Sequence, residues 1–305
     1  MALVTAGRYL KRALAGEVLF DEPMARHTTY RIGGPADLYI TCETLADLTE
    51  TLSVLTSEDV PWLALGKGSN MLVADAGYRG AVIVLGKEFK GHSADGAAIT
   101  AGAGCILAYV VRDAFSLGLS GLESSVGIPG TLGGAIAMNA GTRDDWIGRV
   151  VESVTVCHPE LGLERVHGAD VEWGYRTSGL ADRGVMVEAT LRLEPAERTA
   201  LQASMDAALG RRKRSQPLGQ PSAGSVFVNP PDDSAGRLIE AAGLKGTRLG
   251  GAMISDVHAN FIVNRGGASA ADVLGLIRKV QMTVRDRNGI ELKPEIKLVG
   301  SFEAA

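Results

Sequence analysis

Residues 118–141, GLSGLESSVGIPGTLGGAIAMNAG, form a glycine-rich segment that is otherwise apolar and carries one charge, on Glu123. Glycine lacks a Cβ, so its backbone can adopt positive φ and bring peptide N–H groups close to an anion. Within the segment, Ile128-Pro129-Gly130-Thr131 predicts a rigid turn. The segment fits a phosphate-bearing cofactor, and a buried loop packed against a sheet is the competing interpretation.

A second glycine loop, LGKGSNMLV (65–73), directly follows an apolar run at 62–65 that we expect to be a buried strand. Its glycines expose backbone N–H groups, while Ser69 and Asn70 add side-chain donors for pyrophosphate oxygens. The loop lacks the Gly-Lys-Ser/Thr ending of a Walker A loop. Met71 also stands where a dinucleotide-binding Gly-x-Gly-x-x-Gly has its third glycine. We interpret it as a phosphate cradle of another kind, with a purely structural turn as the alternative.

The composition favours a globular protein that acts on a small molecule. The chain has 305 residues, of which 46% are hydrophobic and 22% charged, which is enough for two or three domains with a large core. A net charge of −4 argues against a nucleic-acid partner. We find no apolar run of the roughly 18 residues that a membrane span needs and no signal-peptide pattern. We therefore expect a soluble cytoplasmic monomer with no membrane partner.

The cysteines predict free thiols rather than a disulfide framework or a metal site. Cys42, Cys105 and Cys157 are odd in number, widely spaced and without a Cys-x-x-Cys pair. Cys157 and His158 are adjacent, but neighbouring residues of a strand point to opposite faces. We therefore expect no bound metal.

The periodicity of apolar residues predicts an α+β fold without internal repeats. A helix should begin at the capping-box-like Thr44-Leu45-Ala46-Asp47, since leucines at 45, 48, 52 and 55 fall on one face. Largely alternating residues at 150–156 and 185–193 predict strands with one buried face, and shorter strands are expected at 62–65 and 82–85.

A change of composition at Glu194-Pro195 marks the expected domain boundary. It leads into a helical run through Leu201, Met205 and Leu209 that ends in Gly210 and the basic tract 211–214. Beyond a linker at 216–224, we expect helices at 234–242 and 269–288 and a short strand at 290–292. These elements predict a smaller C-terminal domain.

Arg176, Ser225 and Glu295 are the candidate catalytic residues. Aromatic neighbours in WGYRTS (173–178) can fix the guanidinium fork of Arg176 for binding a carboxylate. Ser225, in PSAGSVFVNP (221–230), can donate a proton only where its surroundings stabilise an alkoxide. Glu295 follows Pro294 on an extended stretch. Alone, each also fits a plain structural role: a surface salt bridge, a turn cap and an exposed carboxylate.

Eight motifs together carry a resemblance that none of them carries alone. In chain order they are HTTYRIGG (27–34), LGKGSNMLV (65–73), GLSGLESSVGIPGTLGGAIAMNAG (118–141), WGYRTS (173–178), PSAGSVFVNP (221–230), EAAGLKG (240–246), HANFIVN (258–264) and PEIKLVG (294–300). In this order they closely resemble the UDP-N-acetylenolpyruvoylglucosamine reductase (MurB) family over nearly the whole chain.

The resemblance implies a two-lobed FAD-binding region of the PCMH/vanillyl-alcohol-oxidase type at 1–197, with lobes of about 1–86 and 87–197. A smaller α+β substrate-binding domain would follow at 198–305. FAD would be noncovalent, because neither loop contains histidine or cysteine. The residues that the resemblance assigns to FAD are Gly66, Lys67, Gly68, Ser69, Asn70, Gly127, Ile128, Pro129, Gly130, Thr131, Gly134, Asn139 and Val187.

The resemblance also implies the reaction. NADPH would reduce the flavin, which then passes hydride to the enolpyruvyl ether of UDP-N-acetylglucosamine, giving UDP-N-acetylmuramate for peptidoglycan synthesis. Arg176 and Glu295 would stabilise the enolate-like intermediate, and Ser225 would protonate its α-carbon. The residues implied to bind substrate are Tyr175, Arg176, Lys213 and Asn229.

Two departures from the family pattern limit this transfer of roles. The short interval between Arg176 and Ser225 implies the subtype that lacks a tyrosine-bearing loop over UDP. Val228 stands where lysine is common, and the basic tract 211–214 is a possible replacement. The alternatives are another flavin-dependent oxidase or dehydrogenase on the same fold, and a flavin-binding regulatory domain without turnover.

Overall fold

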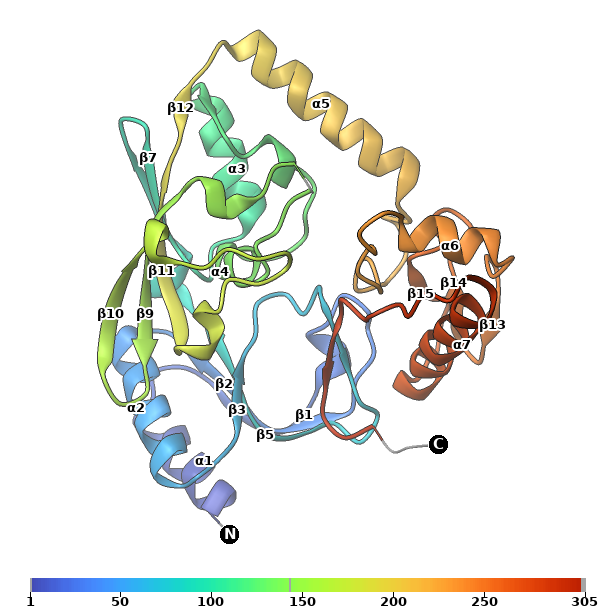
Figure 1. Cartoon of the computed structure of the whole chain (residues 1–305). Helices are drawn as coiled ribbons and strands as arrows, with labels where there is room; N and C mark the ends of the chain where they lie inside the picture. The colour runs from blue at the N-terminus through green and yellow to red at the C-terminus, as the bar shows by residue number, and fades with distance from the viewer. Residues whose placement is uncertain (1, 143, 303–305) are drawn as a thin grey trace. The chain divides into compact units, whose positions relative to one another are not determined.

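The structure, a computed structural model, describes residues 2–142 and 144–302 and divides the chain into two compact units (Figure 1). Unit 1 comprises the residues up to Phe20, Leu38–Lys67 and Gly80–Gly210. Unit 2 comprises Asp21–Asp37, Gly68–Arg79 and the residues from Arg211 onwards. This division differs from the boundaries expected at 86 and 197, because two N-terminal segments group with the C-terminal residues.

Helices and strands are mixed along the chain, which confirms the α+β class. The helices are α1 (Ala2–Ala13), α2 (Leu45–Ser57), α3 (Leu107–Ser116), α4 (Leu132–Ala137), α5 (Arg198–Ser215), α6 (Ala235–Ala241) and α7 (Ala270–Asn288). The strands before the glycine-rich segment are β1 (Val18–Pro23), β2 (Pro35–Cys42), β3 (Trp62–Ala64), β4 (Met71–Val73), β5 (Tyr78–Leu85), β6 (His92–Asp95) and β7 (Ala98–Gly102). The later ones are β8 (Leu119–Ser120), β9 (Val151–His158), β10 (Gly162–His167), β11 (Val185–Arg192), β12 (Glu194–Pro195), β13 (Arg248–Leu249), β14 (Ala252–Ile254), β15 (Ile262–Asn264) and β16 (Lys297–Val299).

A five-stranded antiparallel sheet in unit 1 has the order β10-β9-β11-β7-β6. Its strands β9 and β11 confirm the expected strands at 150–156 and 185–193. Helix α4 contacts β7 and β11, and Figure 1 shows α3 and α4 on one side of this sheet. The segment 118–141 begins just after α3 and contains α4, so the sheet and α3 together position it.

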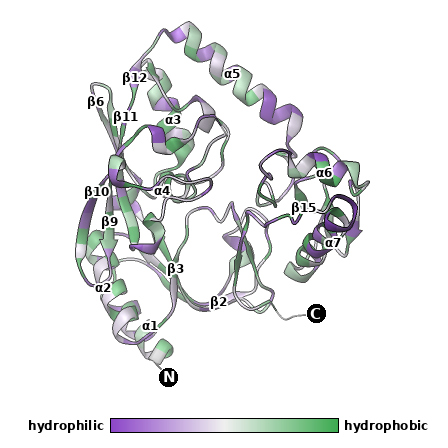
Figure 2. Cartoon of the chain, viewed as in Figure 1, coloured by the Kyte–Doolittle hydropathy of each residue, from purple (hydrophilic) through white to green (hydrophobic). Residues whose placement is uncertain are grey.

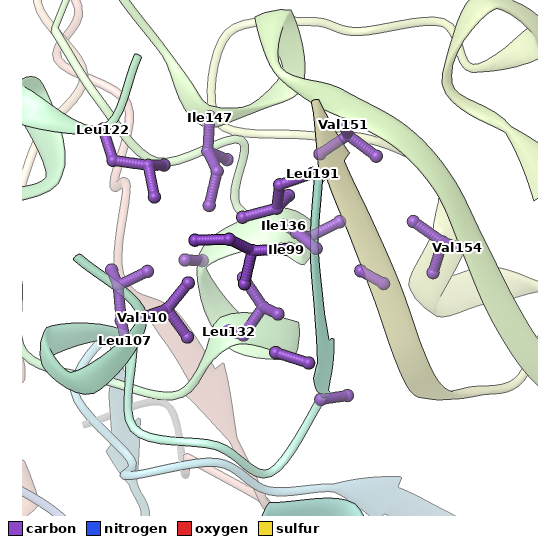
Figure 3. Close-up of a cluster of buried hydrophobic side chains, with 14 of the residues drawn as sticks. Ile99, Leu107, Val110, Leu122, Leu132, Ile136, Ile147, Val151, Val154 and Leu191 are labelled. Atoms are coloured by element: carbon purple, nitrogen blue, oxygen red, sulfur yellow. The ribbon is translucent and has the colours of Figure 1, made fainter. Parts of the chain in front are cut away.

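Apolar side chains from the sheet and both helices fill the space between them (Figure 3). Ile99 of β7 and Leu191 of β11 gather with Val110 of α3 and with Leu132 and Ile136 of α4, and all five are buried. Burial of such a side chain contributes about 1.5–3 kcal/mol. This core therefore holds α4, and with it the glycine-rich turn that precedes it, firmly against the sheet.

A second core of unit 1 contains the helix predicted at Thr44. The Thr44 hydroxyl accepts from the Asp47 N–H at 3.1 Å, and Leu48, Leu52 and Leu55 are buried on one face of α2. Nearby, β3 pairs in parallel with β5. The prediction of a buried strand at 62–65 is right only in part, because β3 ends at Ala64 and that residue is exposed.

Unit 2 has its own core between α6, α7 and the three-stranded sheet β13-β14-β15. Helix α7 confirms the prediction at both ends, since Ser269 forms a capping box with Asp272 and Gly289 closes the helix at φ +68°. The predicted strand at 290–292 is wrong. Leu292 is buried in the core instead, and its carbonyl accepts from the Gln281 side chain at 2.9 Å.

Segment 68–79 joins unit 2 through backbone pairing. Strand β16 pairs in parallel with β4, with Lys297 opposite Met71 and Val299 opposite Val73. The Asp75 carboxylate accepts from the first two N–H groups of α7, at 2.7 and 2.9 Å. Such long-range pairings leave no local pattern, which is why the composition suggested a simpler boundary.

Helix α5 includes Gly210 and ends at Ser215 with Arg212, Lys213 and Arg214 in its last turn, which confirms the helical run expected there. One glycine costs a helix about 1 kcal/mol relative to alanine, and the arginines and lysine that follow are good helix formers. Figure 2 shows hydrophilic residues along much of this helix. In the described part of the chain, we find no helix with the length and apolarity to span a membrane.

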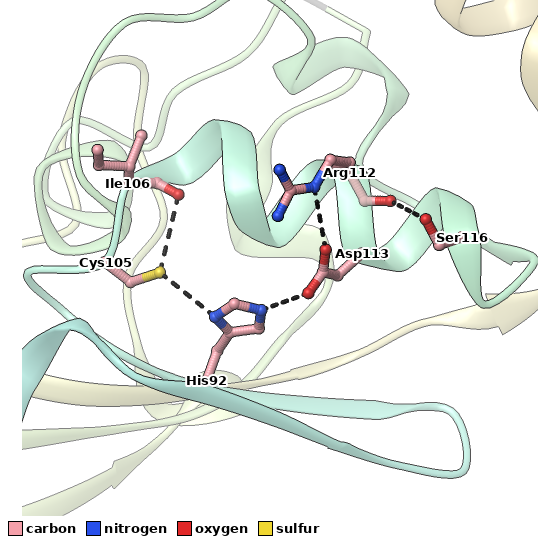
Figure 4. Close-up of polar contacts among 6 residues, drawn as sticks. All are labelled: His92, Cys105, Ile106, Arg112, Asp113 and Ser116. Carbon is pink, nitrogen blue, oxygen red and sulfur yellow. Dashed lines mark hydrogen bonds and ion pairs between the residues drawn. The ribbon is translucent and has the colours of Figure 1, made fainter.

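A polar network attaches β6 to α3 (Figure 4). The ring of His92 contacts the Asp113 carboxylate through Nε2, and its Nδ1 lies 3.8 Å from the Cys105 sulfur. Burial raises the pKa of the Cys105 thiol, which favours its protonated form. Cys105, Cys42 and Cys157 are all buried and free.

The His92 network gives a pH-dependent prediction. The hydrogen bond from His92 holds the pKa of Asp113 below its usual value. The contribution of Asp113 to stability is therefore present above the unfolded pKa of about 3.9 and is lost as the pH falls through the lower folded pKa. We expect Asp113→Asn to melt at a lower temperature than the wild type at pH 7, with the difference shrinking towards pH 3. The effect should be small because the pair is partly exposed.

Thermal unfolding followed by circular dichroism from pH 7 to pH 3 tests this. Asp95→Asn is the matched control, since Asp95 lies on the same exposed strand as His92, β6. This substitution should not change the melting temperature. Equal melting of Asp113→Asn and wild type at pH 7 would contradict the prediction.

Candidate active site

The two glycine loops meet within unit 1. A Cβ on Gly66 of the first loop would lie 2.7 Å from Oγ1 of Thr131 in the second. That hydroxyl also accepts from the Gly134 N–H at 3.2 Å and so caps α4. Only a residue without a side chain fits at position 66 unless Thr131 moves. The structure thus brings the predicted loops into contact through backbone that is accessible at Gly66 and Gly134.

The remainder of the first loop lies in unit 2, where it bonds to residues of other motifs. The Thr29 N–H donates to the Gly68 carbonyl at 3.2 Å, and the Thr29 hydroxyl donates to the Ser222 carbonyl at 2.7 Å. The Asn70 side chain donates to the carbonyl of Glu295 at 3.3 Å. Asn70, which we predicted to contact pyrophosphate, therefore also ties this loop to the segment that carries Glu295.

Asn139 has a bridging role that the sequence did not reveal. It is buried with φ +40°, its Nδ2 donates to the Gly174 carbonyl at 2.9 Å and its Oδ1 accepts from the Gly148 N–H at 3.1 Å. The side chain thus fixes Gly174, two residues before Arg176. Its predicted contact with the flavin stays a prediction.

Arg176 lies at the tip of a tight turn closed by mutual bonds between Gly174 and Thr177. Its φ of +59° is a conformation that glycine or asparagine normally takes at this place in a turn. Such backbone costs about 1–3 kcal/mol and is found preferentially at functional sites. The guanidinium donates from Nη1 to the Gly141 carbonyl at 3.2 Å, and its Cζ lies 5.4 Å from the Tyr175 ring centroid. The aromatic neighbour expected for Arg176 is therefore Tyr175.

Ser225 and Glu295 belong to adjacent backbone segments of unit 2. The Glu295 N–H donates to the Val226 carbonyl at 2.7 Å, and the Val228 N–H donates to the Lys293 carbonyl at 2.9 Å. Both candidate side chains are half-buried. The fold thus brings together two of the three predicted catalytic residues, which are 70 positions apart, while Arg176 belongs to unit 1.

The other predicted residues have more varied surroundings. Lys67, Tyr175 and Lys213 are exposed, and Val187 is buried in β11, where its carbonyl accepts from the Ala103 N–H at 2.8 Å. Asn229 accepts through Oδ1 from the first N–H of α6 at 3.0 Å, which orients its amide. Within residues 2–142 and 144–302, no three His, Cys, Asp or Glu side chains are placed to hold a metal ion.

Similarity to known proteins extends over both units. Residues 216–299 match the family model of the C-terminal domain of UDP-N-acetylenolpyruvoylglucosamine reductase, and residues 36–160 match the FAD binding domain model. The reductase of that name from Heliobacterium modesticaldum is 46% identical over 95% of this chain and 93% of its own length. The one from Bacillus subtilis is 40% identical over 95% and 97%.

A solved structure agrees with these relatives. The crystal structure of UDP-N-acetylenolpyruvylglucosamine reductase (MurB) from Thermus caldophilus matches with a TM-score of 0.81 at 38% identity, covering 94% of this chain and all of the other. The matches confirm an FAD-binding region followed by a C-terminal reductase domain. With identities of this size over nearly its full length, the chain belongs to the UDP-N-acetylenolpyruvoylglucosamine reductase family.

Proposed function

We propose that the chain reduces UDP-N-acetylglucosamine enolpyruvate to UDP-N-acetylmuramate, with FAD as cofactor and NADPH as electron donor. The observation that carries this proposal is the pairing of the Ser225 and Glu295 segments inside the region 216–299 that matches the reductase domain. The reaction supplies a peptidoglycan precursor. Its nucleotide sugar and NADPH are cytoplasmic metabolites, so we place the enzyme in the cytoplasm.

The residues of unit 1 fit FAD. Backbone from both glycine loops converges where Gly66 touches Thr131, and Gly127 and Gly134 are exposed without side chains to block a ligand. Such N–H-rich backbone suits the oxygens of a pyrophosphate. When bound, FAD accepts a hydride from NADPH and delivers it to the vinyl carbon of the substrate.

The substrate then needs a cation and an acid from the protein. Hydride addition at the β-carbon places negative charge on the α-carbon and its carboxylate. We propose that the fork of Arg176 binds that carboxylate in the bidentate manner of guanidinium groups, and that Glu295 takes part in stabilising the intermediate. The Ser225 hydroxyl donates its proton to the α-carbon, and the alkoxide is reprotonated from solvent. Tyr175, Lys213 and Asn229 are proposed to hold the rest of the substrate.

An anaerobic half-reaction experiment tests this function. The purified yellow protein is reduced with one equivalent of NADPH, UDP-N-acetylglucosamine enolpyruvate is added, and the flavin absorbance is followed. Rapid reoxidation with formation of UDP-N-acetylmuramate is the expected result. A flavin that stays reduced would contradict the proposal, and reduction by an alcohol or hydroxy acid without NADPH would favour the oxidase alternative.

Gly66→Ala tests the FAD site independently of turnover. The new methyl group would displace Thr131 from its cap on α4, because Oγ1 lies 2.7 Å from the added Cβ. We expect FAD binding to weaken about 10-fold, equivalent to roughly 1.4 kcal/mol. Titration of the apoprotein with FAD, followed by flavin fluorescence, measures the change.

Gly219→Ala is the matched control, since a Cβ there meets no atom within 4 Å and φ is not positive. It should bind FAD like the wild type. If Gly66→Ala binds FAD with wild-type affinity, the contact between the two loops is not part of the FAD site.

A further inference from the structure

Asn260 is a buried polar residue whose hydrogen bonds converge on the segment that follows Ser225. It is only 3% exposed and precedes β15 in unit 2. Its carbonyl accepts from the Val226 N–H at 2.8 Å. Its side chain accepts from the Phe227 N–H at 2.9 Å and donates to the Phe227 carbonyl at 2.8 Å. One residue thus satisfies three backbone groups of two consecutive residues.

The opposite edge of the same segment bonds to the Glu295 segment. There the Val226 carbonyl accepts from the Glu295 N–H, and the Val228 N–H donates to the Lys293 carbonyl. Phe227 also forms an antiparallel bridge with Pro294. Segment 226–228 is therefore bonded on both edges, and the Asn260 amide takes the place that a neighbouring strand would occupy.

This attachment matters because the residue directly before Ser225 is a glycine. Gly224 precedes it with φ +77°, and a Cβ at that position would meet no atom within 4 Å. Glycine in open space imposes little on the direction of the next residue. The residues after Ser225, which Asn260 and the Glu295 segment hold, therefore help to set the position of its hydroxyl.

Asn260 is itself fixed by its own motif. Its N–H donates to Nδ1 of His258 at 3.1 Å, and the His258 ring lies 5.0 Å from that of Phe261. Burial lowers the pKa of His258, which favours the neutral ring that can accept this bond. The asparagine therefore presents its amide from a rigid turn.

We propose that Asn260 is a positioning residue for proton transfer, and that its amide holds the segment that follows Ser225 and so places the Ser225 hydroxyl. The proposal rests on the proposed function. It places the effect of Asn260 in one half-reaction only: the reduction of flavin by NADPH does not use Ser225, whereas reoxidation by the enolpyruvyl substrate does. A displacement of about 1 Å in a catalytic group can slow a reaction about 100-fold.

Asn260→Asp is the sharpest variant, because it keeps the shape and the acceptor but removes the N–H that bonds to the Phe227 carbonyl. In anaerobic stopped-flow experiments with NADPH and then UDP-N-acetylglucosamine enolpyruvate, we expect flavin reduction at the wild-type rate and reoxidation about 10- to 100-fold slower. In a Ser225→Ala background, the same substitution should change neither rate, since the group on which it acts is gone.

Asn264→Asp is the matched control in the same motif. Its side chain bonds to the Tyr30 carbonyl and to the N–H groups of Gly266 and Ala268, not to segment 225–228. It is expected to lower the melting temperature without a selective effect on reoxidation. If Asn260→Asp does not fold, Asn260→Gln, with the amide one methylene further out, should show the same selective slowing.

The outcomes separate this proposal from the function on which it rests. Equal slowing of both half-reactions, or a further loss in the Ser225→Ala background, would overturn the positioning role and leave the reductase activity established. Wild-type protein that is not reoxidised by the enolpyruvyl substrate would overturn both.

Discussion

Ser225→Ala will leave flavin reduction by NADPH nearly intact and slow reoxidation by the enolpyruvyl substrate by about 10²- to 10⁴-fold, the range of a lost general acid. The reason is that the carbanion formed by hydride addition needs a proton, and alanine has none to give. Ser225 is half-buried in unit 2, on the segment that bonds to Glu295. The backbone bonds of that segment do not involve the serine side chain, so we expect the variant to fold.

The two half-reactions are measured separately by anaerobic stopped-flow absorbance. Ser222→Ala is the matched control: it lies in the same motif, and the structural bond from Thr29 uses its carbonyl rather than its hydroxyl. Its rates should equal those of the wild type. If Ser225→Ala slows both half-reactions equally, Ser225 is not the proton donor.

Arg176→Lys will lower the rate of reoxidation about 10²- to 10³-fold, as expected when a donor to a developing anion is lost. A lysine ammonium is a point charge and cannot reproduce the planar fork that binds both oxygens of a carboxylate. It also loses the bond from Nη1 to the Gly141 carbonyl, which orients the present side chain. Arg176→Gly should be equally inactive and yet fold well, because glycine accepts φ +59° without strain.

Steady-state turnover, together with thermal melting, separates catalysis from folding in these variants. Arg149→Lys is the control, since Arg149 likewise bonds a carbonyl, that of Asp144 at 3.0 Å, and stacks near an aromatic ring, that of Trp146. It should retain activity. Wild-type turnover in Arg176→Lys would exclude Arg176 from the site.

Helix ends could be predicted from the sequence because their causes are local. The side chain of Thr44 reaches an N–H three residues away, and Ser269 with Asp272 does the same at the start of α7. Gly289 ends that helix through its own backbone conformation. Signals that act within one turn of helix leave a readable pattern. Gly210 lies within α5, since one glycine is too weak a breaker to stop a helix.

Contacts between distant residues could not be predicted in the same way. Two contacts join positions about 200 residues apart in the chain: the bond of the Asp75 carboxylate at the start of α7, and the parallel pairing of β4 with β16. Because of such contacts, the two units differ from the domains expected from the sequence. Within the candidate site, the glycine loops were identifiable by composition. The hydrogen bonds of the Asn139 and Asn260 side chains were not, because a buried asparagine shows this role only through its bonding partners.

The pairing of β4 with β16 also has a consequence for the order in which the protein forms during synthesis. Strand β4 leaves the ribosome early, but its parallel partner is made almost last. At the about 5–20 residues per second of translation, β4 must wait roughly 10 to 45 s for β16. Unit 1 has all its residues by Gly210 and is free to fold first. The nascent chain therefore carries the β4 segment without its strand partner through that interval, so unit 2 is completed only when translation is almost finished.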